Sequence, residues 1–230
     1  MLRYEKAKGA LHVRLITLAL LCLVGLLAAC ARPLTDGETR MAQDIFGSTL
    51  DTDAVRVTQG LGLSPPPEMT TGAAPISLSD GLRPGLCART APQASTGPPP
   101  AWAIYNRMHF IEGLYRTDMS EGWPEGALFP QALIFAHELV HVWQWQNRKL
   151  TGYRPARAAF ESIVMMDPYF YVPGEEGTFL DFGYEQQAAL LEDYLCHALY
   201  DPQNPRRAEL RGILAPYFPL AGLDAALRGE

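Results

Sequence analysis

The chain has 230 residues, of which 48% are hydrophobic, and a formal net charge of −6. This acidic balance, with no basic patch interleaved with aromatics, excludes nucleic acid as a natural partner. The length is enough for one domain with a sizeable core.

The first thirty residues have the pattern of an export signal. Four basic residues precede an apolar run over residues 15–29. This run is shorter than the roughly 20 residues that a membrane-spanning helix needs, so we predict a signal peptide over residues 1–29. The run ends in Leu27-Ala28-Ala29-Cys30, which resembles the cleavage box of bacterial lipoproteins. The resemblance implies a lipid on Cys30; an ordinary secretory signal or an uncleaved anchor is the alternative.

The predicted mature chain is a single domain over residues 30–230. Removing the signal takes away four basic residues and Glu5, which leaves 15 basic and 24 acidic residues, or a charge of −9. By the same lipoprotein resemblance, Ala31 after the cysteine favours the outer membrane. We therefore expect a bacterial cell-envelope protein that faces the periplasm and contacts the membrane through its N-terminal lipid.

The N-terminal part of this domain predicts a helix and a strand. Within residues 33–50, Thr35 or Asp36 can cap a helix, and Glu38 completes a capping box with Thr35. Residues 54–58 alternate as a strand does.

A loop rich in proline and glycine follows, over about residues 60–100. It contains nine prolines and six glycines, a composition that cannot hold long helices or central strands. Cys87 lies in this loop and Cys196 lies near the C-terminus. In an oxidising compartment we expect these two cysteines either to form a disulfide or to remain as two buried thiols.

Residues 103–111 predict a strand pair, or one long strand, with a turn at Asn106-Arg107. Strands beside a metal-binding helix commonly receive a peptide as an added strand. We assign this place to residues 108–111, with an ordinary core strand as the alternative.

The pentapeptide His137-Glu138-Leu139-Val140-His141 lies in a predicted helix over residues 131–149. Residues four apart on a helix share one face, so the two imidazoles can bind one Zn²⁺. Glu138 takes the place of the general base in metalloproteases with this pattern. The alternative is two core histidines bonded to backbone carbonyls.

A second helix, predicted within residues 181–200 and entered after Gly183, offers the third ligand. Glu185 and Glu192 are seven residues apart and share a face with the small Ala188 and Ala189, which allow a close approach to the histidine helix. We predict that Glu185 binds the metal. Glu192, or as its rival Asp193, accepts a hydrogen bond from a ligand imidazole.

The sequence His-Glu-Leu-Val-His-Val-Trp-Gln with the downstream Tyr-Glu-Gln-Gln-Ala helix resembles small bacterial zinc metallopeptidases of the gluzincin kind. The likeness covers both ends of the mature chain but not the proline-rich loop. It implies His137, His141 and Glu185 as ligands and Glu138 as the base. One departure is Ala189, because the best-known gluzincins have an acidic residue four positions after the ligand glutamate.

The expected fold is α+β: a minimal zincin-like domain in which a small mixed sheet packs on the histidine helix and the Glu185 helix crosses it. Residues 169–172 predict a short strand or an aromatic wall, and residues 206–228 predict helical cover broken at Pro216 and Pro219. The candidates for stabilising an oxyanion remain unranked: Tyr184, Tyr194, His197 and His109.

The expected function is zinc-dependent hydrolysis of a peptide or protein substrate. The alternative is a catalytically inactive, zinc-binding lipoprotein scaffold in the cell envelope. Structural zinc sites usually close with four protein ligands, often cysteines, and the two cysteines left in the mature chain do not have that spacing. A third reading is zinc-dependent amide hydrolysis in cell-wall peptides.

Overall fold

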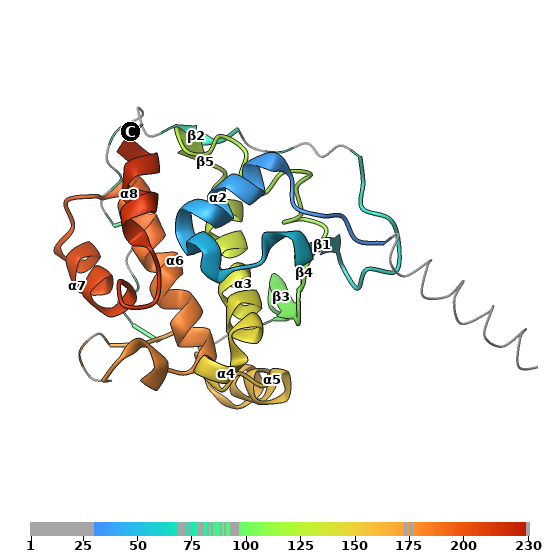
Figure 1. The fold of residues 1–230 in the computed structure, drawn as a ribbon. Coiled ribbons are helices and arrows are strands. Elements are labelled where there is room, and N and C mark those ends of the chain that lie inside the picture. The colour runs from blue at the N-terminus through green and yellow to red at the C-terminus, as the bar shows by residue number, and fades with distance from the viewer. Residues whose placement is uncertain are drawn as a thin grey trace, which may run out of the picture.

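The histidine-bearing helix α3 lies at the centre of the fold, with a small sheet on one side and the long helix α6 on the other (Figure 1). The computed structural model describes residues 30–228 except 69–71, 73, 78–80, 82, 84, 88, 90, 93–96, 173, 175 and 176. The predicted signal peptide therefore lies outside the described residues. Helices and a small sheet share one core, which makes the fold α+β.

The main sheet has three strands in the order β1-β4-β3. Strand β1 (Arg56–Gln59) runs parallel to β4 (Arg107–Phe110), and β3 (Ala101–Ile104) runs antiparallel to β4. The turn between β3 and β4 is Tyr105-Asn106, one residue earlier than predicted, because Arg107 already pairs with Ile104. A second sheet joins β2 (Ile76–Ser77), in the proline-rich loop, to β5 (Gly126–Ala127).

The helices follow the predicted order with one addition. Their bounds are α2 Asp36–Phe46, α3 Gln131–Gln146, α4 Arg148–Thr151, α5 Pro155–Val164, α6 Tyr184–Tyr200, α7 Pro205–Leu214 and α8 Leu220–Arg228. Short 3₁₀ turns occupy Gly47–Thr49, Thr52–Ala54 and Phe179–Asp181. Thr35 and Glu38 form the capping box of α2. Helix α5 was not predicted, and residues 169–172 form no strand.

The helix predicted over residues 131–149 is two helices. Asn147 interrupts it: the side-chain amide donates to the carbonyl oxygens of Trp143 and Thr49, both at 3.0 Å. Such side-chain bonds to the backbone compete with helix continuation. Helix α4 then ends at Gly152, whose φ of 66° is the left-handed conformation that glycine adopts without strain.

One cluster of buried apolar side chains, ranging from Met41 to Leu223, forms the core. Helix α3 is buried around most of its circumference, from Gln131 to Gln144. Its polar residues are therefore enclosed and need partners. Within the described residues, no helix is both long and apolar enough to cross a membrane.

Candidate metal centre

Helices α3 and α6 bring His137, His141 and Glu185 together. The two Nε2 atoms lie 3.2 Å and 3.1 Å from the same carboxylate oxygen, Oε2 of Glu185. One donor atom from each of the three residues lies within 4.8 Å of the others. These residues form a group that can hold a metal ion.

The close approach of α6 to α3 places Glu185 at this point. Ala188 and Ala189 are fully buried, so no larger side chain separates the helices. At the start of α6, Glu161 of α5 accepts a hydrogen bond from the backbone N–H of Tyr184 (2.9 Å). An acidic side chain at this end also suits the positive end of the helix dipole.

The other nitrogen of each imidazole faces its own acceptor. Nδ1 of His137 lies 3.0 Å from Oε2 of Glu192, and Nδ1 of His141 lies 2.9 Å from Oε1 of Gln144. Gln144 is fixed because its amide donates to the backbone oxygen of Tyr184 and to Gln187. These bonds hold the rings so that both Nε2 atoms point to Glu185.

The carboxylate of Glu185 is also held through its second oxygen. The hydroxyl of Ser162, on α5, donates to Oε1 at 2.8 Å. Oε2 therefore remains directed at the two rings. The sequence alone gave no signal for Ser162, since its contact with residue 185 depends on how α5 packs.

Asp193, the sequence-based rival to Glu192, has a different role. It accepts hydrogen bonds from Arg89 at 3.2 Å and from the hydroxyl of Tyr171 at 2.7 Å. Arg89 belongs to the proline-rich loop, which a disulfide between Cys87 and Cys196 attaches to α6. The loop thus places a cation beside the acidic face of α6, with Arg89 3.8 Å from Glu192.

Glu138 lies beside the three potential ligands with one oxygen unpaired. Among the described residues, Oε2 of Glu138 is buried and has no hydrogen-bond partner. Burial raises the pKa of Glu138 to about 7. Leaving a buried carboxylate oxygen without a hydrogen-bond partner costs folding free energy. Such an unpaired, perturbed group is typical of a residue that acts on a ligand or a water molecule.

The carboxylates also govern the charge of the imidazoles. Burial opposes a positive charge on His137, yet the hydrogen bonds to Glu185 and Glu192 outweigh it and raise its pKa to about 10. Burial likewise opposes a charge on His141, and Glu185 raises the pKa of that ring. The site favours positive charge where the Nε2 atoms and the Glu185 carboxylate meet.

Two cavities meet at this site. The larger, about 380 Å³, lies beside His141 and has mostly apolar walls from β3 and α5. The smaller, about 190 Å³, lies beside His137 and includes Arg89 and Glu192. Three residues line both cavities: Ala101, Glu138 and Tyr169. The junction of the cavities is therefore also the place of the unpaired carboxylate.

Tyr169 is a functional candidate that the sequence analysis did not single out. Its ring lies 5.5 Å from the ring of His137, and its hydroxyl has no hydrogen-bond partner among the described residues. The four oxyanion candidates named from the sequence line neither cavity. Two have bonds elsewhere: the hydroxyl of Tyr184 donates to Gly152 and that of Tyr194 to Asp224. The aromatic run over residues 169–172 was the available signal.

The free sheet edge beside the site belongs to β3. Pro100 accepts a hydrogen bond from the N–H of Ile111, and bonded pairs alternate along an antiparallel ladder. Ala101 and Ala103 therefore direct their N–H and C=O groups away from β4, to an edge that no described strand occupies. The assignment of residues 108–111 as the receiving strand is wrong, because β4 has a neighbour on each side.

The remaining predicted site residue, Cys30, lies beside β1. It is buried, and its backbone oxygen accepts a hydrogen bond from the hydroxyl of Thr58 at 2.7 Å.

An α+β fold with two imidazoles and a carboxylate around one point defines a candidate metal-binding protein. No protein-family model and no curated protein matches this chain. Among solved structures, the chain is similar to the effector domain of Pseudomonas aeruginosa VgrG2b. The two share 23% identity, with a TM-score of 0.46 over 81% of this chain and 83% of that one.

Proposed function

We propose that this protein is a zinc-dependent peptidase with a zincin-like fold of the gluzincin kind. The observation that carries the proposal is the meeting of His137 Nε2, His141 Nε2 and Glu185 Oε2 next to the buried, unpaired oxygen of Glu138. A structural metal needs no unpaired carboxylate at its side, whereas a hydrolytic site needs a base there.

The donor set fits zinc. Zinc prefers imidazole nitrogen and carboxylate oxygen at catalytic sites, with three protein ligands and one open position. Glu192 and Gln144 provide the acceptors that orient ligand imidazoles. Bound there, Zn²⁺ would polarise a substrate carbonyl and lower the pKa of a water molecule.

The residues of the chain supply the other parts of the reaction. Glu138 takes the proton from the attacking water and passes it to the leaving nitrogen. The hydroxyl of Tyr169, at the junction of the two cavities, donates a hydrogen bond to the developing oxyanion. The free edge at Ala101 and Ala103 binds the peptide as an added strand, with the larger cavity receiving one of its side chains.

The experiment combines metal content with hydrolysis of a peptide library. Wild-type protein should contain one zinc per chain and cleave peptides. Glu138→Gln should retain zinc but lose at least about 100-fold in kcat, because it lacks the base. Tyr169→Phe should retain zinc and lose about 100-fold in kcat.

Tyr105→Phe is the matched control, because Tyr105 is exposed and lines neither cavity. Unchanged activity in Glu138→Gln would refute the mechanism. Stoichiometric zinc without cleavage of any peptide would favour the inactive scaffold.

We further propose that the protein acts in the cell envelope with a lipid on Cys30. The support is the Leu27-Ala28-Ala29-Cys30 sequence alone, whose first three residues lie outside the described part. In bacteria fed labelled palmitate, the protein should carry the label and Cys30→Ser should not.

A further inference from the structure

Helix α5 presents an apolar face to solvent. Phe160, Ile163 and Val164 are 63%, 82% and 61% exposed, and the exposed Met165 and Met166 follow directly. These side chains are neighbours on one helix face or in the turn after it. Apolar patches of this kind mark binding sites for partners or membranes.

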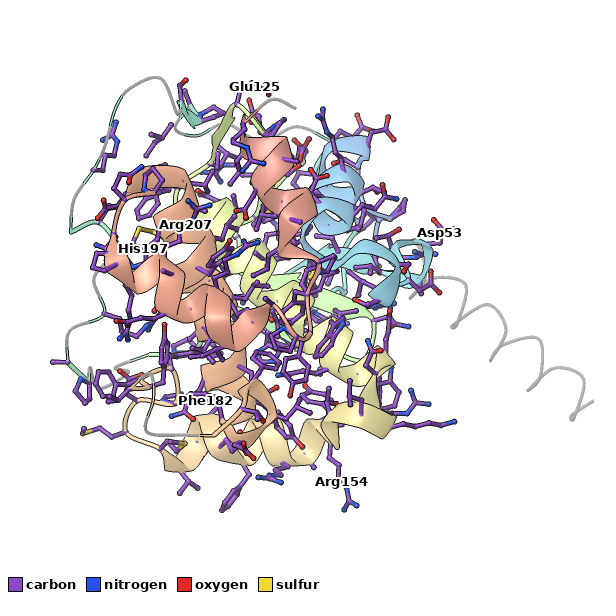
Figure 2. All side chains as sticks on the ribbon, turned by 60° about the vertical axis from the view of Figure 1, so that its left-hand side comes forward. Asp53, Glu125, Arg154, Phe182, His197 and Arg207 are labelled. Carbon is purple, nitrogen blue, oxygen red and sulfur yellow. A yellow bond between two sulfur atoms is a disulfide. The ribbon has the colours of Figure 1, made fainter. Side chains whose placement is uncertain are left out.

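Basic side chains precede this apolar face in the chain, on α4 and at the start of α5. Arg148, Lys149, Arg154 and Arg157 are all exposed, and Glu161 is the one acidic residue between positions 148 and 166. The segment therefore carries +3 in a chain whose total charge is −6. Figure 2 shows Arg154 pointing away from the body, at the end of the molecule that α4 and α5 form.

The other face of α5 is firmly attached to the domain. Ala158 is buried, Glu161 accepts the hydrogen bond from the N–H of Tyr184, and Ser162 bonds Glu185. These contacts fix the orientation of the helix. The exposure of its outward apolar residues is therefore not a result of loose packing.

We propose that this α4–α5 surface, residues 148–166, binds the surface of an anionic lipid bilayer. Helices that bind in the membrane interface combine protruding apolar side chains with Lys and Arg, which attract acidic headgroups. Four of the five charged side chains in this surface are basic, which complements acidic headgroups. An anionic bilayer therefore matches this surface, which is both cationic and apolar.

This binding would bring the active-site region close to the membrane. Ile163 belongs to the outward face and also lines the larger cavity beside His141. The cavity therefore opens next to the lipid surface. The proposal requires neither hydrolysis nor a lipid on Cys30, so it can fail or succeed independently of the proposed function.

The test is vesicle co-sedimentation of residues 30–230 carrying Cys30→Ser, a piece that contains the whole core from Met41 to Leu223. With residues 148–166 unchanged, this protein should bind vesicles containing phosphatidylglycerol and should not bind vesicles of phosphatidylcholine alone. Phe160→Ser with Ile163→Ser should bind roughly tenfold or more weakly. Arg148→Gln with Arg154→Gln should bind these vesicles about 25-fold more weakly, about fivefold for each basic residue removed.

The matched control is Leu61→Ser with Leu63→Ser, which removes two leucines, 71% and 72% exposed, from the loop after β1. It should bind like the wild type, and the unfolding temperature of every variant should be unchanged. Equal binding to both vesicle types, or no binding to either, would overturn the proposal. So would a wild-type dimer that dissociates in the Phe160 and Ile163 variant, because a second copy would then be the occupant.

Discussion

Glu185 is held through both of its carboxylate oxygens. One oxygen faces the two imidazoles and the other accepts the hydrogen bond from Ser162. Burial would raise the pKa of Glu185, but His141 and His137 hold it well below its usual range. The carboxylate is thus kept charged and oriented, as a metal ligand must be.

Glu192 orients the ring of His137 through its contact with Nδ1, the nitrogen that faces away from Glu185. In Glu192→Ala, the Nδ1 atom of His137 loses its acceptor and the ring loses its fixed orientation. We expect zinc to bind 10-fold to 100-fold more weakly, a change of roughly the size found for such supporting residues. Competition with a chromogenic chelator measures the affinity.

Glu209→Ala is the control for this change, because it also removes a carboxylate, from an exposed pair with Arg206 at 3.6 Å. Its affinity for zinc should equal that of the wild type. If Glu192→Ala also binds zinc like the wild type, the supporting role of Glu192 is wrong.

At the scale of elements, the disulfide joins the proline-rich loop to α6. Cys87 and Cys196 are 109 residues apart, so the bond closes a long loop of the chain. Cross-links of this kind mainly reduce the entropy of the unfolded chain. The tether also keeps Arg89 next to Asp193 and Glu192.

Replacing both cysteines by serine should lower the free energy of unfolding by about 2–5 kcal/mol. Urea denaturation followed by circular dichroism measures the change. Ser64→Ala, at an exposed position, is the control and should leave the stability within about 0.5 kcal/mol of the wild type. A double variant as stable as the wild type would mean that the bond does not stabilise the protein by restricting the unfolded chain.

The sequence predicted the elements whose residues are close in the chain. The four-residue spacing of His137 and His141, and the seven-residue spacing of Glu185 and Glu192, are properties of single helices. Helix α5, of which only Ala158 is buried, was missed. The contact of Ser162 with Glu185 also escaped prediction, because no local spacing connects residues on different helices. The receiving strand was misassigned for the same reason, since the order of strands in a sheet is a property of tertiary structure.

At the scale of the whole molecule, Glu38 connects the N-terminal segment to the body. It is fully buried and accepts two hydrogen bonds from Arg32, at 2.6 Å and 2.7 Å, and one from the backbone of Met119 at 2.9 Å. The chain before α2 is thereby attached to a loop about eighty residues away.

Glu38→Ala should destabilise the protein by about 3–5 kcal/mol, because it leaves the mostly buried guanidinium of Arg32 without its carboxylate partner. Thermal unfolding measures this loss. Asp53→Ala, in an exposed 3₁₀ turn, is the control and should have little effect. A loss below about 1 kcal/mol in Glu38→Ala would contradict the anchoring role.

The most direct test of the metal centre is a crystal structure of the zinc-treated protein with anomalous scattering recorded at the zinc edge. We expect one strong peak about 2.0–2.2 Å from His137 Nε2, His141 Nε2 and Glu185 Oε2. No peak at that point, or a peak bound by other residues, would contradict it.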